Sequence, residues 1–354
     1  MTSHAEQDWS AGASLLGVAA WAVIATSAGT GRVPMGVIEL LFLFGPLVVV
    51  PLGLELAGLV APSPTSGLER WARWLQPFAA AMVVLSFWRH PGRGATVLVA
   101  GWAVICGFVA MAGVLALLRK GNKTLVEILA HIGRLDLAVG AVWLMLSRSG
   151  WHIMGFREPI ILLTAVHFHY SGFGMATIAA ATLKMAQRRG WNTCLLPVVA
   201  LLVTLLPFVI AIGFVMSPGL KVGAAVALSV SVGMLAVFVL SLSGNLVSMT
   251  ARLSLRGGVG FVVVGMALAA VYAVGDFLHQ DWLDIPRMAS THGLVNGLGF
   301  VLLCLLGYIV ELDVGEGRTR NNVGRAEHLI GSRRSLVRGV GANLSFVARD
   351  FYDR

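Results

Sequence analysis

Charged residues are scarce in this sequence, and their scarcity excludes an ordinary soluble domain. Asp, Glu, Lys and Arg make up only 12% of the 354 residues, whereas a soluble globular protein carries about 25%. Hydrophobic residues account for 57% of the chain, and its mean hydropathy is +0.82. The apolar runs approach the ~20 residues that a helix needs to cross a bilayer, and they are too long for the strands of a membrane barrel. The sequence therefore predicts an all-α fold, a polytopic transmembrane helix bundle.

Cysteine is also rare, and several common catalytic motifs are missing. The three cysteines, Cys106, Cys194 and Cys304, lie far apart in or beside apolar stretches, so we interpret them as small buried residues and not as a disulfide framework or a zinc site. No nucleotide-binding glycine loop, HExxH or GxSxG motif is present. Because no ATP-binding module is visible, any transport would draw on a gradient or on a partner.

About ten membrane helices are expected from the lengths of the apolar runs and the signals that flank them. Residues 1–11 are polar and lack a basic region, so we expect a short cytoplasmic N-terminus and no cleavable signal peptide. Residues 311–354 hold eight arginines against six acids and form a polar tail, with a helix expected at Asn343–Phe351. The transmembrane domain, 12–310, is divided into predicted helices at 12–30, 35–60, 69–87, 95–118, 124–147, 159–183, 194–216, 222–249, 258–278 and 287–310.

The positive charge of the chain points to a lipid surface and not to nucleic acid. The net charge is +9, but most of the Lys and Arg residues fall in short loops and in the tail. In a ten-helix arrangement, the loops on the side of the N-terminus hold ten Lys and Arg residues, and the opposite loops hold seven. Because basic loops stay in the cytoplasm, we expect both termini of the protein to lie in the cytoplasm. The bilayer is its first partner, and the sequence leaves the oligomeric state open.

Two histidines interrupt the apolar run of residues 159–183. Polar groups at membrane depth cost several kcal/mol unless they find partners, so His167 and His169 mark a candidate site. On a regular helix His167 shares a face with Thr164 and Ser171, whereas His169 points ~160° away. Either the helix is locally unwound and both rings meet at one point, or each histidine has a separate neighbour. Two separately hydrogen-bonded interior histidines are an equally good interpretation.

A second polar face lies on the last predicted helix. His292, Asn296 and Gly299 share that face, where a small residue lets another helix approach and the two polar side chains can bond across the contact. Measured along the helices, His292 lies ~9 Å and His167 ~12 Å below the same membrane surface. This similar depth favours one shared site, although simple interhelical hydrogen bonding would also explain His292 and Asn296.

Carboxylates near these helices are further candidates. Asp136 lies near mid-membrane with no partner on its own helix face, so a histidine from the sixth or tenth helix is its simplest expected partner. Asp276 and His279 lie in an acidic loop before His292, and Glu39 lies at the same end of the second helix. These three residues would form an outer mouth that collects cations or protons, unless the loop is merely a solvated one.

Both histidine segments resemble the motifs of a known family. The run from Glu158 to Phe173 contains HFHYSGF, which resembles the HFHYAGF signature of the YndJ-like family of bacterial membrane proteins, with Ser171 in place of the usual Ala. The run from Met288 to Phe300 is similar to the second motif of that family, HGxxNxxGF. The resemblance implies a bacterial multi-pass membrane protein, and it implies neither a substrate nor a mechanism.

The leading functional hypothesis is a secondary carrier of an unidentified small solute, with protons as a candidate coupling ion. A histidine changes charge near physiological pH, and carboxylate–histidine chains relay protons in membranes. This hypothesis requires no cofactor. The alternative is an intramembrane enzyme in which neutral imidazoles hold a transition metal, and a structural or sensory protein is a third possibility. The predicted solute or proton site comprises His167, His169, Tyr170, His292, Asn296 and Asp136, and the alternative metal site comprises His167, His169 and His292.

Overall fold

The computed structural model describes residues 2–62, 66–191 and 194–314. Within these ranges every regular element is a helix, which confirms the predicted all-α membrane bundle. Residues up to Ile309 form one compact unit, and the chain from Val310 onward forms a second. The first unit holds the candidate site and is described here by itself. Most of the predicted polar tail, including the helix expected at Asn343–Phe351, lies outside the described residues.

Ten helical crossings follow one another in the described part of the chain. Three of them contain π-helical segments, labelled η, in which the helix is locally wider. The crossings are α1 (Thr2–Gly29), α2–η1–α3 (Val37–Phe44, Gly45–Val49, Val50–Val60), α4 (Ser66–Ser86), α5 (Arg93–Leu118), α6 (Leu125–Ser149), α7–η2–α8 (Ile160–His167, Phe168–Gly174, Met175–Arg188), α9 (Leu195–Met216), α10 (Pro218–Ser243), α11 (Met249–Phe277) and α12–η3–η4 (Ile285–Met288, Ala289–Gly293, Val295–Val301), which continues as a helix to Val314.

Eight of these crossings are long and apolar enough to span a membrane by length and composition. The two others are α4 and α7–η2–α8. The first turns of α4 carry Glu69, Arg70 and Arg73, and α7–η2–α8 carries the two histidines of the first motif, so polar residues reduce the apolar character of both. Each nevertheless has more than 20 residues and packs beside its neighbours, since α4 (21 residues) contacts α5 and α8 contacts α6. The architecture therefore matches the ten predicted helices.

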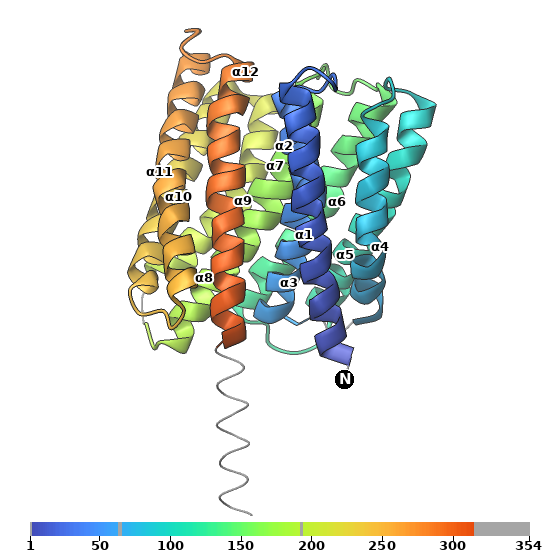
Figure 1. The fold of residues 1–354 in the computed structure, drawn as a ribbon. Coiled ribbons are helices and arrows are strands. Elements are labelled where there is room, and N and C mark those ends of the chain that lie inside the picture. Colours follow the sequence, from blue (N-terminus) through green and yellow to red (C-terminus); the bar gives the residue numbers. More distant parts are fainter. Residues whose placement is uncertain (1, 63–65, 192–193, 315–354) are drawn as a thin grey trace, which may run out of the picture. The chain divides into compact units, whose positions relative to one another are not determined.

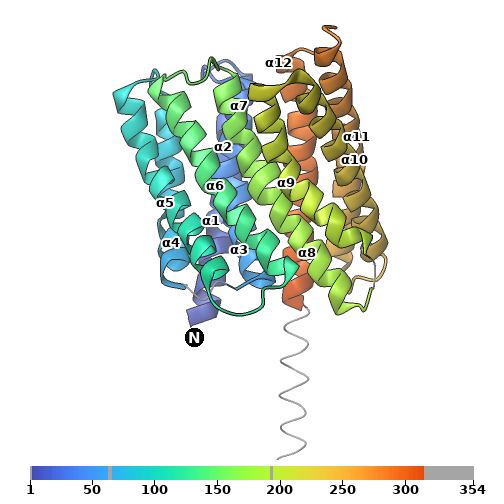
Figure 2. The ribbon, with the colours of Figure 1, turned by 180° about the vertical axis from the view of Figure 1, so that it is seen from behind.

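The helices of the first unit run alternately up and down, side by side (Figure 1). We call the end at which α1 begins the lower end, and the opposite end the upper end. The loops around residues 31–36, 87–92, 150–159 and 278–284 lie at the upper end. Seen from behind, α6 lies between α5 and the α7–η2–α8 crossing, and α9 follows on the other side (Figure 2). The first crossing starts and the tenth ends at the lower end, as an even number of crossings requires.

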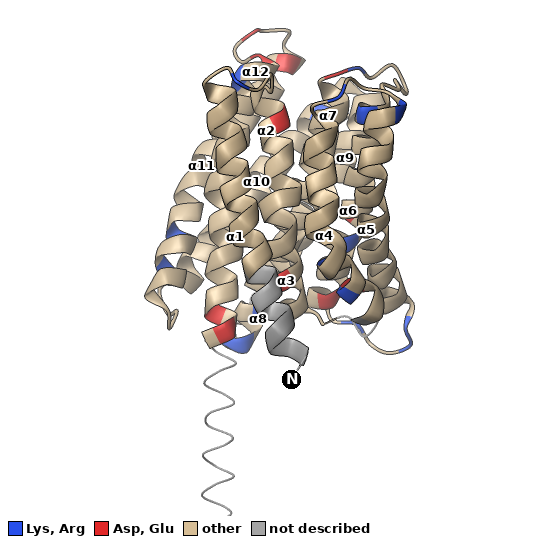
Figure 3. Ribbon diagram, turned by 45° about the vertical axis from the view of Figure 1, so that its right-hand side comes forward, with Lys and Arg blue, Asp and Glu red and all other residues tan. Residues whose placement is uncertain are grey.

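Charge and exposure along the helices agree with a lipid environment. Figure 3 shows Lys, Arg, Asp and Glu gathered toward the two ends of the helices, with few in the band between them. Large apolar side chains project outward from this band, among them Val97, Val142 and Val263, which are 73%, 57% and 55% exposed. A soluble monomer rarely leaves so much contiguous apolar surface uncovered. The described helices therefore present lipid-compatible faces.

The structure corrects three local expectations. The turn between α10 and α11 comes at Gly244–Ser248 and begins six residues earlier than predicted, because the side chain of Ser248 accepts a hydrogen bond from the backbone N–H of Ala251 and starts α11 there. The arginines that were expected in a loop, Arg252 and Arg256, instead lie on α11. The candidate span of α1, Gly12–Gly29, is the first predicted helix, and α1 itself begins at Thr2. Cys194 is exposed, whereas the other two cysteines are buried as expected.

Candidate functional site

Both sequence motifs lie on π-helical segments. The first motif occupies η2, between α7 and α8, and the second occupies η3 and η4 in the last crossing. The remaining crossing with a π-helical segment is α2–η1–α3, and η2 contacts both η1 and η4. A π-helical turn holds one extra residue and is frequent at functional sites. Three irregular crossings therefore meet in the interior of the bundle.

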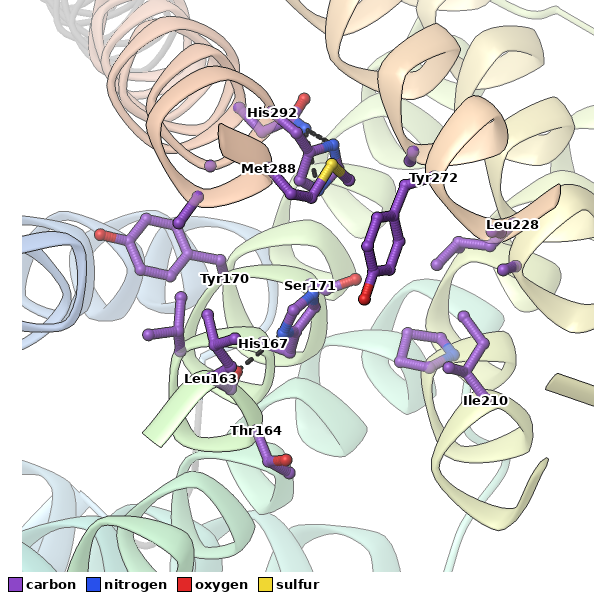
Figure 4. Close-up of a pocket in the computed structure, with 18 of the residues that line it drawn as sticks. Leu163, Thr164, His167, Tyr170, Ser171, Ile210, Leu228, Tyr272, Met288 and His292 are labelled. Atoms are coloured by element: carbon purple, nitrogen blue, oxygen red, sulfur yellow. Dashed lines mark hydrogen bonds between the residues drawn. The ribbon is translucent and has the colours of Figure 1, made fainter. Parts of the chain in front are cut away.

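A cavity of about 430 Å³ opens between these irregular crossings and helices α9, α10 and α11. It extends from residues at the upper end, such as Ile160 and Ile285, to residues deep in the bundle, such as Ser171 and Val301. Its walls are largely aliphatic and aromatic. Four predicted site residues line it together: His167, Tyr170, His292 and Asn296. Figure 4 shows His167 and His292 on different walls, with the ring of Tyr272 reaching in from α11.

His167 presents one bare ring nitrogen to this cavity. Its Nδ1 atom lies 2.7 Å from the carbonyl oxygen of Leu163, and because a carbonyl only accepts, Nδ1 must carry the proton. The Nε2 atom then carries a lone pair, and it has no hydrogen-bond partner among the described residues. Thr164 and Ser171 line the cavity on the same face, as the helical wheel predicts. His167 is therefore an exposed hydrogen-bond acceptor in the cavity.

His292 is held in the same way by another helix. Its Nδ1 atom lies 2.8 Å from the carbonyl oxygen of Gly265 on α11, so Nδ1 again donates. The amide nitrogen Nδ2 of Asn296 lies 2.9 Å from Nδ1 and 3.4 Å from Nε2 of this ring. Because Nδ1 gives its proton to Gly265, the Asn296 amide donates to Nε2. Position 265 must be a glycine, because a Cβ atom there would overlap the side chain of Asn296. The close approach of α11 thus orients both polar side chains of the second motif.

His169 faces the opposite side of η2 and does not line the cavity. Its ring is fully buried, stacks on Trp102 at 5.9 Å between centroids, and meets the ring of Phe42 edge-on. Its Nδ1 donates to the carbonyl oxygen of Ala165 at 2.8 Å, and its Nε2 accepts from the indole N–H of Trp102 at 3.2 Å. Both ring nitrogens are therefore satisfied within the core. Of the two arrangements considered for the motif, this is the one with a separate neighbour for each histidine.

Tyr170 connects three irregular crossings. Its hydroxyl group donates to the carbonyl oxygen of Leu41 at 2.7 Å, which ties η2 to α2. Its ring packs against Gly45 of η1 and against Gly297 of η4, where a Cβ atom would lie 2.9 Å from the ring. Only 8% of Tyr170 is exposed. Tyr170 therefore forms part of the cavity wall and holds that wall in place.

Asp136 is buried without a partner. It is fully enclosed on α6, and neither carboxylate oxygen has a hydrogen-bond partner among the described residues. Its side chain packs against Gly172, where an added Cβ would lie 2.7 Å from the Asp136 Cβ atom. The expected hydrogen bond to a histidine is not formed. Asp136 does not line the cavity, so the structure does not bring it together with His167 and His292.

The three residues predicted for the outer mouth separate in the structure. Asp276 lines the upper part of the cavity and forms an ion pair with Lys221 of α10, with 2.5 Å between Oδ2 and Nζ. The Lys221 ammonium also lies 4.9 Å from the centre of the Phe214 ring. His279 is exposed in the following loop and Glu39 lies at the start of α2, and neither lines the cavity.

The three-histidine metal site is not assembled in the described residues. No group of three or more His, Cys, Asp or Glu side chains there is placed to hold a metal ion. The reason is geometric, because His169 points into the Trp102 side of η2 while His167 and His292 face the cavity. The donor set therefore does not fit the metalloenzyme alternative.

Sequence reasoning missed several residues that shape the site. Lys221 and Tyr272 line the cavity, Trp102 fixes His169, and Gly265 admits Asn296. A lysine four residues after the single-residue turn at Ser217 was a usable signal, since that turn had to lie at the upper end. The roles of Trp102 and Gly265 depend on which helices are neighbours, and helical periodicity does not contain that information.

Fold and cavity together define a polytopic helical membrane protein with a largely apolar chamber that reaches from one end of the bundle to its middle. A family model described as YndJ-like protein matches residues 40–300, which include every crossing that lines the cavity. The chain belongs to this YndJ-like family.

A curated relative supports the same assignment. The chain is 29% identical over 238 residues to a Bacillus subtilis (strain 168) protein named as an uncharacterized membrane protein YndJ. The alignment covers 66% of this chain and 41% of the relative, so the chain spans about two-fifths of the length of that relative. No solved structure matches the chain.

Proposed function

We propose that this protein is a secondary carrier that binds a small solute in the cavity between η2, η4 and helices α9–α11. The observation that carries the proposal is that two motifs more than 100 residues apart in sequence place His167 and His292 on the walls of one cavity of about 430 Å³. Mostly apolar pockets of roughly 300–1,000 Å³ with a few placed polar groups are typical of small-molecule sites. A purely structural histidine would have both ring nitrogens paired, as His169 does, whereas the Nε2 atom of His167 has no partner among the described residues.

The hydrogen-bonding pattern indicates what kind of solute fits. Backbone carbonyls take the Nδ1 protons of His167 and His292, so Nε2 is an acceptor in both rings. Nε2 of His292 already accepts from the Asn296 amide, which leaves Nε2 of His167 as the open acceptor. The hydroxyl of Thr164 already donates to the carbonyl oxygen of Ile160 at 2.8 Å. A solute with an apolar body and a hydrogen-bond donor, such as an amine or an alcohol, complements this wall, whereas a carboxylate would meet the lone pair of His167.

The positions of the polar groups support a path from the upper end. The Lys221–Asp276 ion pair lies at the upper part of the cavity, and the histidines lie deeper. Irregular helices around a site near the middle of the bilayer are a recurring feature of secondary carriers. Protons are the proposed coupling ion, because the free Nε2 atom of His167 can accept a proton. We propose this carrier function for the whole protein.

We also propose in which membrane the protein lies and how it is oriented there. We place the protein in a bacterial inner membrane with the lower end in the cytoplasm, because the expected cytoplasmic loops carry ten Lys and Arg residues against seven opposite. Alkaline phosphatase fused after Arg354 should be inactive, and a fluorescent protein fused there should fold and fluoresce. Phosphatase activity from this fusion would overturn the orientation.

The carrier function can be tested on the purified full chain. Thermal unfolding in detergent, screened against a library of small amines, alcohols and acids, should identify a stabilising solute that contains hydrogen-bond donors. Proteoliposomes loaded with a pH-sensitive dye should then take up this solute, and the internal pH should change with uptake. His167→Ala should abolish both effects, whereas His279→Ala, which removes an exposed histidine outside the cavity, should preserve them. Binding without uptake would contradict a carrier and favour a sensory protein.

A further inference from the structure

A second pocket lies at the lower end between α5 and α6, and it is polar where the first cavity is apolar. Its volume is about 340 Å³, and it is formed by the 119–124 loop together with the first turns of α6. Its lining residues are mostly polar or charged, in contrast to the apolar cavity. They are Pro62, Ala116, Arg119, Lys120, Gly121, Asn122, Lys123, Glu127 and His131.

The loop that forms this pocket is closed by its own hydrogen bonds. The ammonium of Lys123 donates to the carbonyl oxygen of Arg119 at 2.9 Å, which joins the two ends of the loop. Thr124 caps α6, and the Glu127 carboxylate accepts from both the backbone N–H and the hydroxyl of Thr124. Gly121 has φ +127°, a conformation that other residues rarely adopt. These hydrogen bonds and the Gly121 conformation therefore hold the loop in the shape that forms the pocket.

Positive charge in this pocket is not neutralised. Arg119 and Lys120 form no ion pair with any described residue. The only carboxylate in the lining, Glu127, is already engaged by the helix cap. Three cations against one acid leave an excess of positive charge facing a space large enough for a small anion.

His131 adds a buried hydrogen-bond donor to the same pocket. Only 3% of it is exposed, and its Nδ1 atom lies 3.5 Å from a guanidinium nitrogen of Arg134. Arg134 only donates, and its other terminal nitrogen bonds the carbonyl oxygen of Ala61 and the carboxylate of Glu69. Nδ1 of His131 must therefore accept, which places the ring proton on Nε2. That N–H group has no partner among the described residues.

We propose that this pocket binds a phosphate group, held by Arg119, Lys120 and the Nε2–H group of His131. Arg and Lys are the side chains that bind phosphate oxygens best, through charge-assisted hydrogen bonds. The phosphate can belong to a free inorganic or organic phosphate or to the headgroup of an anionic lipid, since the pocket lies at the end of the membrane helices. This proposal does not depend on the solute cavity, because the two pockets share no residue.

The test uses the full chain, purified in detergent and stripped of lipid. Inorganic phosphate is titrated against chloride at constant ionic strength, and the midpoint of thermal unfolding is recorded. The wild type should be stabilised by phosphate and not by chloride. The double variant Arg119→Gln/Lys120→Gln should weaken the apparent affinity at least tenfold. Arg188→Gln, which removes an exposed charge at the same end outside this pocket, should leave the affinity unchanged.

A second arm separates the two sources of phosphate. The chain is placed in nanodiscs of phosphatidylcholine alone or with added phosphatidylglycerol, and the lipid retained after detergent extraction is quantified. Stabilisation by phosphatidylglycerol but not by inorganic phosphate, lost in the double variant, assigns the site to a lipid headgroup. Stabilisation by inorganic phosphate assigns it to a free phosphate.

Three outcomes would overturn the proposal. The wild type could respond to neither form of phosphate, the double variant could respond as the wild type does, or Arg188→Gln could lose as much affinity as the double variant. If the double variant does not purify as a single species, His131→Gln provides a second test that keeps every formal charge, and an affinity equal to that of the wild type would again contradict the site. Failure of this test leaves the carrier proposal intact, because no solute is used in it.

Discussion

The two faces of η2 differ more than any other neighbouring regions of this molecule. On one face His169 lies between Trp102 and Phe42, fully buried, with both ring nitrogens hydrogen-bonded. On the other face His167 has the same bond from Nδ1 to a backbone carbonyl four residues earlier, but its Nε2 atom faces a cavity. Both histidines therefore make the same hydrogen bond to the backbone. What separates them is the neighbour at the second nitrogen, an indole in one case and open space in the other.

This comparison shows how a single motif can serve structure and function together. The packed face orders η2 through His169, and Tyr170 anchors the same segment to Leu41. Because the segment is anchored on that side, His167 keeps a defined position without needing a second partner of its own. We therefore expect substitutions on the packed face to change stability and substitutions on the cavity face to change binding.

The largest effect should come from Trp102→Ala on the packed face. Trp102 is completely buried, and removing it leaves a void beside His169 and an unpaired Nε2, so we expect a loss of about 3–5 kcal/mol. Denaturant unfolding in detergent measures this loss. Trp71→Ala is the matched control, because Trp71 is 63% exposed. Equal destabilisation by the two substitutions would show that the Trp102 face is not packed as described.

His169→Ala should cost less, about 1–3 kcal/mol, mainly because the indole N–H of Trp102 loses its acceptor. Affinity for the solute identified in the thermal screen should remain within a factor of about three, since His169 does not line the cavity. The same preparation supplies both measurements, unfolding by denaturant and binding by titration. Loss of binding at unchanged stability would reverse the assigned roles of the two faces.

His167→Ala is the counterpart on the cavity face. It removes a bare acceptor, so solute affinity should fall at least tenfold, about 1.4 kcal/mol, while stability changes by less than about 0.5 kcal/mol. His167→Gln keeps an acceptor oxygen and should recover part of the affinity. Isothermal titration of the three proteins checks this ranking. Unchanged affinity in His167→Ala would remove His167 from the site.

The smallest effect should come from the mouth of the cavity. Asp276→Asn breaks the ion pair with Lys221, in which the two side chains are 39% and 23% exposed. Such pairs contribute about 0.2–1 kcal/mol and are screened by salt. Stability should therefore drop slightly at low salt and not at all at high salt. A drop of the same size at both salt concentrations would mean that Asp276 acts through packing and not through its charge.

Sequence reasoning predicted the membrane architecture well, for a physical reason. The bilayer demands long apolar helices, so length and polarity alone reveal eight of the ten crossings, and most predicted boundaries fall within a few residues of the observed ones. The misplaced turn between α10 and α11 shows the limit. Leu246 and Val247 continue the apolar run through the turn, while Ser248, which starts α11, is one of many serines in this chain.

The site was harder to predict, because it depends on contacts between helices. The wheel correctly separated the faces of His167 and His169, since that separation is local. The contacts of charged residues on α6 also depend on other helices: Glu127 caps α6 at Thr124, whereas Arg134 meets Glu69 of α4, 65 residues away. Asp136 was expected to find a partner across helices and has none among the described residues.

The chain is synthesised from its N-terminus, so the order of its crossings determines when the cavity can form. The hydroxyl of Tyr170 bonds a carbonyl 129 residues earlier, and His292 and Asn296, which line the facing wall, belong to the last crossing. A chain that has emerged only as far as α11 therefore has one motif, an open side and no enclosed chamber. Because domains form as the ribosome delivers them, the wall that carries the second motif is added only with the tenth crossing, and the cavity can form only from that point of synthesis onward.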